Sequence, residues 1–245
     1  MSGSRSTYDT WHDERERADA DPRPKEPWHA LTIAHLPDLR GKRVLEIGCG
    51  RGQFALYLGH QGAEQVVAAD FSSAAVAHAR RRVETLDSVT ALVADVQELP
   101  FADESFDVVI SQETLEHVPD PERGLAELVR VTARGGTLLV TTPNYLSLMG
   151  LWRVLSWLGR RPYSELGQPI NQPLILPARV RSLRRLGCRV DAVAGTHQLL
   201  VVPGFTTVRL SFLERPQRLM KWVCYHGLTV ATRLPPSGAR ADPRS

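Results

Sequence analysis

The stretch VLEIGCGRG, residues Val44–Gly52, decides the fold of this chain. Its first four residues form an apolar run interrupted by one glutamate, and three glycines follow at alternate positions. Glycine lets the backbone turn tightly and lets a ligand approach without a Cβ in the way. A strand that ends in such a turn and leads into a helix predicts a ligand-binding unit. The alternative is a tight turn that binds no ligand.

Two details of this stretch narrow the choice of ligand. The dinucleotide fingerprint G-x-G-x-x-G requires a third glycine at position 53, where this chain has Gln53. Glu46 lies inside the apolar run, and a buried carboxylate needs a partner. A cationic ligand or the ammonium of an amino acid would pair with Glu46, whereas a pyrophosphate would be repelled. Both details weaken the alternative of a nicotinamide-dependent dehydrogenase.

Strands and helices alternate from here to about residue 144. The pattern predicts strands at 42–48, 64–70, 88–95, 106–113 and 135–144, and helices at 29–39, 53–62, 72–86 and 121–133. Ser72 or Ser73 is the expected cap of the third of these helices. Such alternation predicts a parallel sheet with helices on both faces, and ligands bind such sheets at the carboxyl ends of the strands. Later segments predict a helix at 178–187, strands at 188–195 and 197–204, and a last helix at 216–234.

Two acidic residues end predicted strands. Asp70 lies 18 residues beyond Gly52, where a carboxylate can accept hydrogen bonds from both hydroxyls of a ribose. The alternative for Asp70 is the N-cap of the following helix. Asp95 ends the next strand and precedes Val96; the acid can accept from an exocyclic amine while the apolar neighbour packs on a purine.

The motifs VLEIGCGRG, AADFS, ADVQELPF, FDVVISQETLEHVPDP and ARGGTLLVTTPN together resemble those of class I S-adenosylmethionine-dependent methyltransferases. The nearest likeness is to the group that includes the ubiquinone-biosynthesis O-methyltransferases. It covers about residues 27–145, with five motifs in order. The resemblance implies an α/β fold with a Rossmann-like sheet, mostly parallel with an antiparallel strand near the C-terminus. It also implies S-adenosyl-L-methionine as the cofactor.

The resemblance further implies where each part of the cofactor lies. The three glycines would lie against its methionine and ribose portions, Glu46 and Gln112 at its methionine end, Asp70 at the ribose, and Asp95 with Val96 at the adenine. The expected cofactor-binding residues are Glu46, Gly48, Cys49, Gly50, Gly52, Asp70, Phe71, Asp95, Val96 and Gln112.

His117 is the candidate general base. A hydroxyl acceptor must lose a proton when it is methylated, and histidine titrates in the required range. His117 follows the fourth predicted strand, but a structural histidine in the turn before Pro119 is the alternative. Four other histidines have no supporting spacing: His29, His35, His197 and His226. Glu113 and Glu116 are helix-spaced without an obvious third ligand, so we expect no metal.

The segment 146–158 is apolar over most of a helical surface, including Trp152 and Trp157. Such a helix must be covered by the core, a partner chain, an apolar substrate or a membrane. We expect it to form a lid or wall of the acceptor site. A homodimer contact and peripheral membrane contact through residues 146–161 are the alternatives, because Arg160 and Arg161 would suit anionic headgroups.

Composition and charge indicate the compartment and the domain organisation of the chain. Three scattered cysteines and no apolar signal-type segment predict a cytoplasmic protein with reduced thiols. Residues 150–222 are basic, which would suit an anionic surface or only a solvated face. We expect a flexible arm at 1–25, a methyltransferase domain at 26–203 with an apolar insertion at about 145–178, and a C-terminal helix and tail at 204–245.

The predicted function is methyl transfer from S-adenosylmethionine to a small acceptor, apolar or aromatic, at oxygen. We expect no nucleic-acid partner, because no appended nucleic-acid domain is visible in the sequence. The alternative from another class is a cofactor-binding interaction module without catalysis.

Overall fold

The computed structural model describes residues 9–10, 26–147, 150, 172–196, 199–202, 206–209 and 222–236. These residues form one seven-stranded sheet and a separate two-stranded sheet, β7 (Leu199–Val202) with β8 (Thr206–Arg209). Across the large sheet the strands follow the order β3 (Val89–Val93), β2 (Gln65–Asp70), β1 (Arg43–Ile47), β4 (Phe106–Gln112), β5 (Thr132–Pro143), β9 (His226–Arg233) and β6 (Cys188–Thr196).

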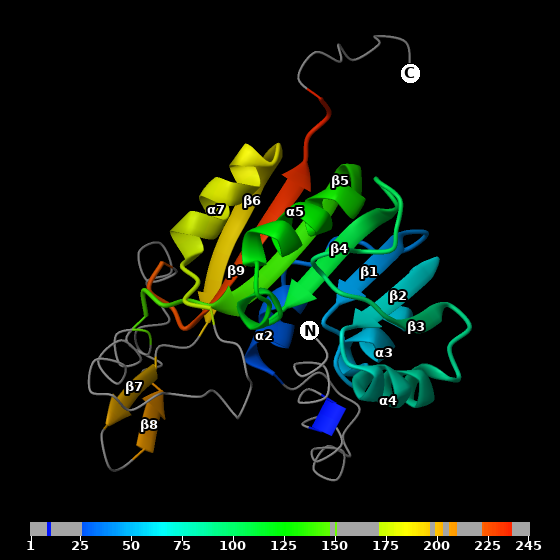
Figure 1. The fold of residues 1–245 in the computed structure, drawn as a ribbon, viewed down its shortest axis with the longest axis horizontal. Helices are drawn as coiled ribbons and strands as arrows, with labels where there is room; N and C mark the ends of the chain where they lie inside the picture. Colours follow the sequence, from blue (N-terminus) through cyan, green and yellow to red (C-terminus); the bar gives the residue numbers. More distant parts are fainter. Residues whose placement is uncertain are drawn as a thin grey trace.

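The first five strands of the chain are parallel to one another, and β9 runs antiparallel to both of its neighbours. Figure 1 shows the arrow of β9 pointing opposite to those of β4 and β5. The predicted α/β sheet, mostly parallel with an antiparallel strand near the C-terminus, is therefore confirmed.

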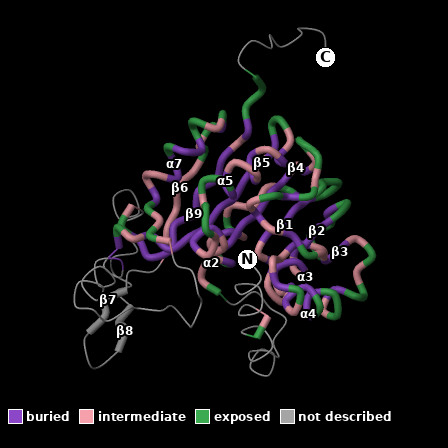
Figure 2. Tube along the Cα trace, viewed as in Figure 1, coloured by how far each residue is buried: buried purple, intermediate pink, exposed green. Residues whose placement is uncertain are grey.

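Helices cover both faces of the sheet. The strands alternate their side chains between two buried clusters, because successive residues of a strand point to opposite faces. One cluster includes residues of α2 (Pro27–Ile33), α3 (Gln53–Gly59) and α4 (Ser73–Val83). The other includes residues of α5 (Pro121–Val131) and α7 (Leu176–Arg185). Buried residues accordingly follow the strands, and exposed ones gather at loops and outer helix turns (Figure 2).

Local capping positions the helices at the ligand-binding edge. Ser72 is the N-cap of α4, and its side chain accepts a hydrogen bond from the Ala75 amide at 3.1 Å. Asp120 caps α5 in the same way through the Arg123 amide at 3.0 Å. A side-chain oxygen at this position satisfies one of the amides that a helix start leaves unpaired.

The predicted C-terminal helix is wrong where the structure describes it. Residues 226–233 form β9, which lies between β5 and β6 inside the sheet rather than after a domain that ends at 203. This strand is buried on both faces and does not simply alternate apolar with polar residues, so periodicity did not distinguish it from a buried helix. Residues 216–221 of the expected helix lie outside the described residues.

Other expectations fall mostly or wholly outside the described residues. Of the N-terminal arm at 1–25, the structure describes residues 9–10, and of the apolar helix at 146–158 it describes residues 146, 147 and 150. Within the described ranges, no helix is long and apolar enough to cross a membrane.

Candidate active site

The glycine-rich turn lies between β1 and α3, at the carboxyl edge of the sheet. Gly48, Gly50 and Gly52 all have positive φ, at 77°, 50° and 77°. A Cβ on Gly48 would lie 2.0 Å from the Thr114 hydroxyl oxygen, and one on Gly52 would lie 2.9 Å from the Ala79 Cα. Packing within the chain therefore requires glycine at both positions, in addition to any contact with a ligand.

Asp70 ties this turn to the start of α4. Its two carboxylate oxygens accept hydrogen bonds from the Gly50 amide at 2.8 Å and from the Ser72 amide at 2.9 Å. Because Ser72 is the N-cap of α4, the alternative role of Asp70 as that cap is excluded. The carboxylate lies at the point where the ends of β1 and β2 meet.

Glu46 is buried in β1 directly before the turn, with 3% of its surface exposed. Its Oε2 atom has no hydrogen-bond partner in the part of the chain that the structure describes. Burial, and then the negative charge of Asp70, raise the pKa of Glu46 well above its ordinary value. Burial also raises the pKa of the neighbouring Cys49 thiol, so Cys49 is a neutral group in this wall.

The predicted adenine residues follow β3. Asp95 accepts hydrogen bonds from the Gln97 amide at 2.8 Å and from its side chain at 3.2 Å. Val96 is buried, and a Cβ on Gly124 of α5 would lie 3.4 Å from it. The Val96 side chain thus packs toward α5, and its contact with adenine stays a prediction.

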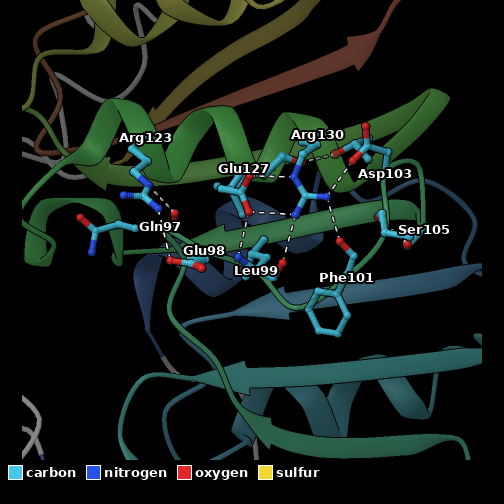
Figure 3. Close-up of polar contacts among 12 residues, drawn as sticks. Gln97, Glu98, Leu99, Phe101, Asp103, Ser105, Arg123, Glu127 and Arg130 are labelled. Atoms are coloured by element: carbon cyan, nitrogen blue, oxygen red, sulfur yellow. Dashed lines mark hydrogen bonds and ion pairs between the residues drawn. The ribbon is translucent and has the colours of Figure 1, made fainter.

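A network from α5 holds the segment that follows Asp95, and the sequence reasoning missed it (Figure 3). Arg130 donates to the carbonyl oxygens of Leu99 and Phe101 at 3.0 and 2.8 Å and to Asp103 at 2.8 Å. Arg130 also binds Glu127, and these hydrogen bonds lower the pKa of Glu127. The only sequence signal is the i, i+3 spacing of Glu127 and Arg130.

Two further predicted cofactor residues, Gln112 and Phe71, lie at the end of β4 and directly after β2, at the same edge of the sheet. Gln112, at the end of β4, is buried and donates a hydrogen bond to the Thr32 hydroxyl of α2 at 2.8 Å. Figure 1 shows α2 at the edge of the sheet where the arrowheads of β4 and β5 lie. Phe71 is half-buried directly after Asp70.

His117 ends a short 3-10 helix, η2 (Leu115–His117), which follows β4. Its Nε2 lies 3.6 Å from the carboxylate of the buried Glu116, and its amide donates to the Thr114 carbonyl at 3.0 Å. The histidine is therefore near the end of β4, as the sequence predicts, and its role as a base stays a prediction.

The structure brings together two residues that the sequence reasoning set aside. Nδ1 of His226, at the start of β9, lies 2.9 Å from Oε2 of Glu113, directly after β4. No sequence pattern links them, because they come together only through the insertion of β9 beside β5.

Comparison with known proteins links part of the chain to methyltransferases. Residues 45–140 match the family model described as a methyltransferase domain. The chain is 36% identical over 132 residues to a demethylmenaquinone methyltransferase of Thermobifida fusca, covering 53% of this chain and 56% of the relative. Residues 45–140 therefore match a methyltransferase domain, and relatives that share this part of the chain include S-adenosylmethionine-dependent methyltransferases.

The likeness extends to other methyltransferases, over part of their length. A phosphatidylethanolamine N-methyltransferase of Cereibacter sphaeroides is 40% identical over 112 residues, which are 44% of this chain and 54% of that protein. The chain thus spans about half the length of these relatives. A chain from the complex between the Haloferax volcanii Trm112 methyltransferase activator and a methyltransferase has a TM-score of 0.67 at 22% identity, over 95% of this chain and 98% of its own. This last likeness shows the shared fold.

The residues at the edge of the sheet fit the family's cofactor, S-adenosylmethionine. The unpaired Glu46 oxygen is a buried acceptor beside the glycine-rich turn, which suits the ammonium of the methionine portion. This observation comes from the chain itself and is independent of the comparisons.

Proposed function

We propose that this protein is an S-adenosylmethionine-dependent methyltransferase that acts on a small acceptor, apolar or aromatic, at oxygen. The observation that carries the proposal is a buried Glu46 oxygen, unpaired among the residues that the structure describes, beside a turn whose Gly50 amide donates to Asp70. A carboxylate there suits an amino-acid ammonium, and the second carboxylate lies where ribose hydroxyls bind in folds of this class.

Different residues of the chain would bind the cofactor and remove the proton of the acceptor. S-adenosylmethionine supplies an electrophilic methyl group on its sulfonium. Glu46 and Asp70 would bind and orient the donor molecule, and His117 would take the proton that a hydroxyl acceptor loses. Orientation of the two reactants is itself a large part of the rate gain in such a transfer.

The proposed class of acceptor rests on two relatives and on the side chains at the end of β4. The two relatives carry demethylmenaquinone and phosphatidylethanolamine in their names, and both of these molecules are largely apolar. Neither name indicates an oxygen acceptor, so the proposal for oxygen rests on the ionisable side chains at the end of β4. The lid at 146–158, peripheral membrane contact at 146–161 and a homodimer stay predictions from the sequence.

Calorimetry and a methyl-transfer assay test the proposal. S-adenosylmethionine should bind at micromolar concentration and NAD much more weakly; tighter binding of NAD would overturn the assignment. Labelled methyl transfer to 2-naphthol, and to vesicles that contain phosphatidylethanolamine, separates oxygen from nitrogen acceptors. Tight cofactor binding without transfer to any acceptor would favour the interaction module.

Asp70→Ala provides a sharper test of the cofactor site. Each lost hydrogen bond to a charged group costs about 1.5–3 kcal/mol, so cofactor affinity should fall at least about tenfold. Asp87→Ala, an exposed acid beyond the far end of α4, is the matched control and should bind normally. Equal affinity of the two folded variants would remove Asp70 from the cofactor site.

A further inference from the structure

The Glu113–His226 pair lies where three strands end at one edge of the sheet. Glu113 directly follows β4, and its Oε2 lies 2.9 Å from Nδ1 of His226. His226 opens the antiparallel strand β9 and pairs with Pro143, the last residue of β5. The pair therefore bridges β5 at the edge where ligands bind this class of sheet.

The backbone holds Glu113 in a conformation that glutamate rarely adopts. Its φ is +49°, in the left-handed region, and its amide donates to the Thr141 carbonyl at 3.1 Å. The next residue, Thr114, fills the space that a Cβ on Gly48 would need. Strain of this kind persists when surrounding structure enforces it and often marks a functional site. Glu113 therefore directly precedes Thr114, the residue that packs against the glycine-rich turn at Gly48.

One oxygen of this carboxylate has a partner and the other has none among the described residues. Oε2 is paired with His226, whereas Oε1 is buried and makes no hydrogen bond within the described ranges. Leaving a buried charged acceptor without a donor is costly. The arrangement thus suits a ligand that brings one hydrogen-bond donor to Oε1.

The surroundings of the pair are aromatic. The ring of Trp28, from α2, lies 4.9 Å from the His226 ring, and the ring of Tyr225 lies 4.2 Å from it. Aromatic side chains contribute a large apolar surface and stack on flat molecules. Aromatic rings beside the pair would suit a planar acceptor better than a flexible polar one.

The charges near the pair disfavour an anionic acceptor. Arg179 of α7 is buried, and the carboxylates of Glu113 and Glu116 both act on its charge. Arg179 donates hydrogen bonds to neutral groups of Thr142, Thr229 and Gly227. Burial raises the pKa of the nearby Cys224 thiol to about 11, so the thiol is neutral. Two carboxylates against one guanidinium favour an uncharged donor.

We propose that Glu113 is the acceptor-binding residue of this enzyme: its Oε1 accepts a hydrogen bond from the hydroxyl to be methylated on a planar, uncharged acceptor. His226 is the positioning residue that holds the carboxylate through Oε2. The inference rests on the proposed function and adds to it the class of acceptor. The hydroxyl has a single proton, so its hydrogen bond to Glu113 orients the bound acceptor before that proton passes to His117.

Calorimetry with two matched probes tests the role of Glu113. The protein is saturated with S-adenosylhomocysteine and titrated with 2-naphthol or with 2-methoxynaphthalene, which has the same ring without the donor. The wild-type protein should bind 2-naphthol more tightly by roughly tenfold or more, because a hydrogen bond to a charged group is lost with the ether. Glu113→Gln should lose most of this preference.

Further variants separate binding from folding. Glu113→Gly removes the carboxylate and suits the positive φ, so it should fold and also lose the preference. His226→Asn retains a donor for Oε2 and should keep most of the preference, whereas His226→Phe should lose it. Glu104→Gln is the matched control, because Glu104 also has a positive φ, 61°, and is ion-paired with Arg134 away from this site.

The outcomes distinguish this inference from the proposed function. A wild-type protein that binds S-adenosylhomocysteine but shows no preference for 2-naphthol would overturn the inference alone. So would an unchanged preference in both Glu113 variants with normal S-adenosylhomocysteine affinity. Failure of the wild-type protein to bind S-adenosylhomocysteine or S-adenosylmethionine would overturn the proposed function itself.

Discussion

Glu46 is an ionisable residue in a buried position, where a negative charge is unfavourable unless it is paired. The side chain is inside the sheet, one oxygen has no partner in the described part of the chain, and burial raises its pKa. Burial favours the protonated carboxyl, whereas a cationic ligand beside it would favour the ionised form. We therefore expect the protonation state of Glu46 to be coupled to the binding of a cationic ligand.

The first prediction concerns this coupling. Because the folded pKa is above the unfolded value of 4.5, the folded protein binds a proton that the unfolded chain releases. Stability should therefore fall as pH rises from about 4.5 through the folded pKa, and Glu46→Gln should flatten that slope. Urea unfolding of both proteins between pH 4 and 8 measures the slopes. Identical slopes would show that Glu46 ionises as readily in the folded protein.

From the raised pKa of Glu46 we also predict that protons are released when the cofactor binds. The ammonium of S-adenosylmethionine favours the ionised carboxylate, so binding should release protons into the buffer. Calorimetry in two buffers of different ionisation enthalpy detects this release. The Gln variant should show little buffer dependence, and equal proton release in both proteins would assign it to another group.

His117 carries the second prediction. If it is the general base, His117→Ala should lower turnover of a hydroxyl acceptor by roughly 10²–10⁴ without weakening cofactor binding. Its proximity to Glu116, at 3.6 Å, means that the variant must also be checked for thermal stability. Full turnover in a stable variant would leave orientation of the reactants as the main source of catalysis.

At the scale of elements, α5 fixes the loop that follows the predicted adenine residues. Arg130 reaches two loop carbonyls, and Glu127 accepts from the Leu99 amide at 2.8 Å (Figure 3). A loop without regular structure is held in one conformation by a helix whose own ends are capped. The position of Asp95 therefore depends on α5 as well as on β3.

The third prediction tests this dependence. Arg130→Met should destabilise the protein by about 1–2 kcal/mol at pH 7, since it leaves a partly buried carboxylate and two carbonyls without their donor. The lowered pKa of Glu127 means that this stabilisation is present above about pH 4.5 and is lost as pH falls through the folded value. Denaturant unfolding of both proteins at pH 7 and at pH 3–4 should show a difference in stability at pH 7 that shrinks at the lower pH.

Arg123→Met is the control for that measurement. Arg123 contacts the same loop, but its side chain is 58% exposed and lies 3.3 Å from an exposed Glu98. Its loss should change stability by less than about 0.5 kcal/mol. Equal losses for the two variants would contradict a specific role for Arg130.

At the scale of the whole molecule, β9 completes the core. It lies between β5 and β6, and Leu228 on it is fully buried with the residues that pack under α2, α3 and α4. The C-terminal segment is therefore part of the sheet on which both the cofactor turn and the Glu113–His226 pair depend.

The fourth prediction follows from that position. Leu228→Ala should reduce the free energy of unfolding by about 2–5 kcal/mol, because it leaves a cavity in a close-packed core. Leu234→Ala, one residue beyond the strand and 38% exposed, should cost less than about 0.5 kcal/mol. Urea unfolding compares the two, and similar small losses would mean that β9 is not an inner strand.

The sequence by itself determined the parts of this protein that depend on near neighbours. The glycine-rich turn, the alternation of strands and helices up to residue 144 and the cap at Ser72 are each visible in a short window, because backbone conformation and burial leave a local pattern. The motifs of the family resemblance and the predicted cofactor residues lie in these same windows. The strand at 226–233, which is buried on both faces, has no such pattern to distinguish it from a helix.

Only the tertiary structure decided the contacts between distant segments. The insertion of β9 beside β5 brings His226 to Glu113 across 113 residues, and α5 reaches the loop after Asp95 from about 30 residues away. It also placed Val96 toward α5 and gave Gly52 a packing role against Ala79. The physical reason is that strand order and side-chain pairing are set by the packing of the whole core, which no local stretch of sequence encodes.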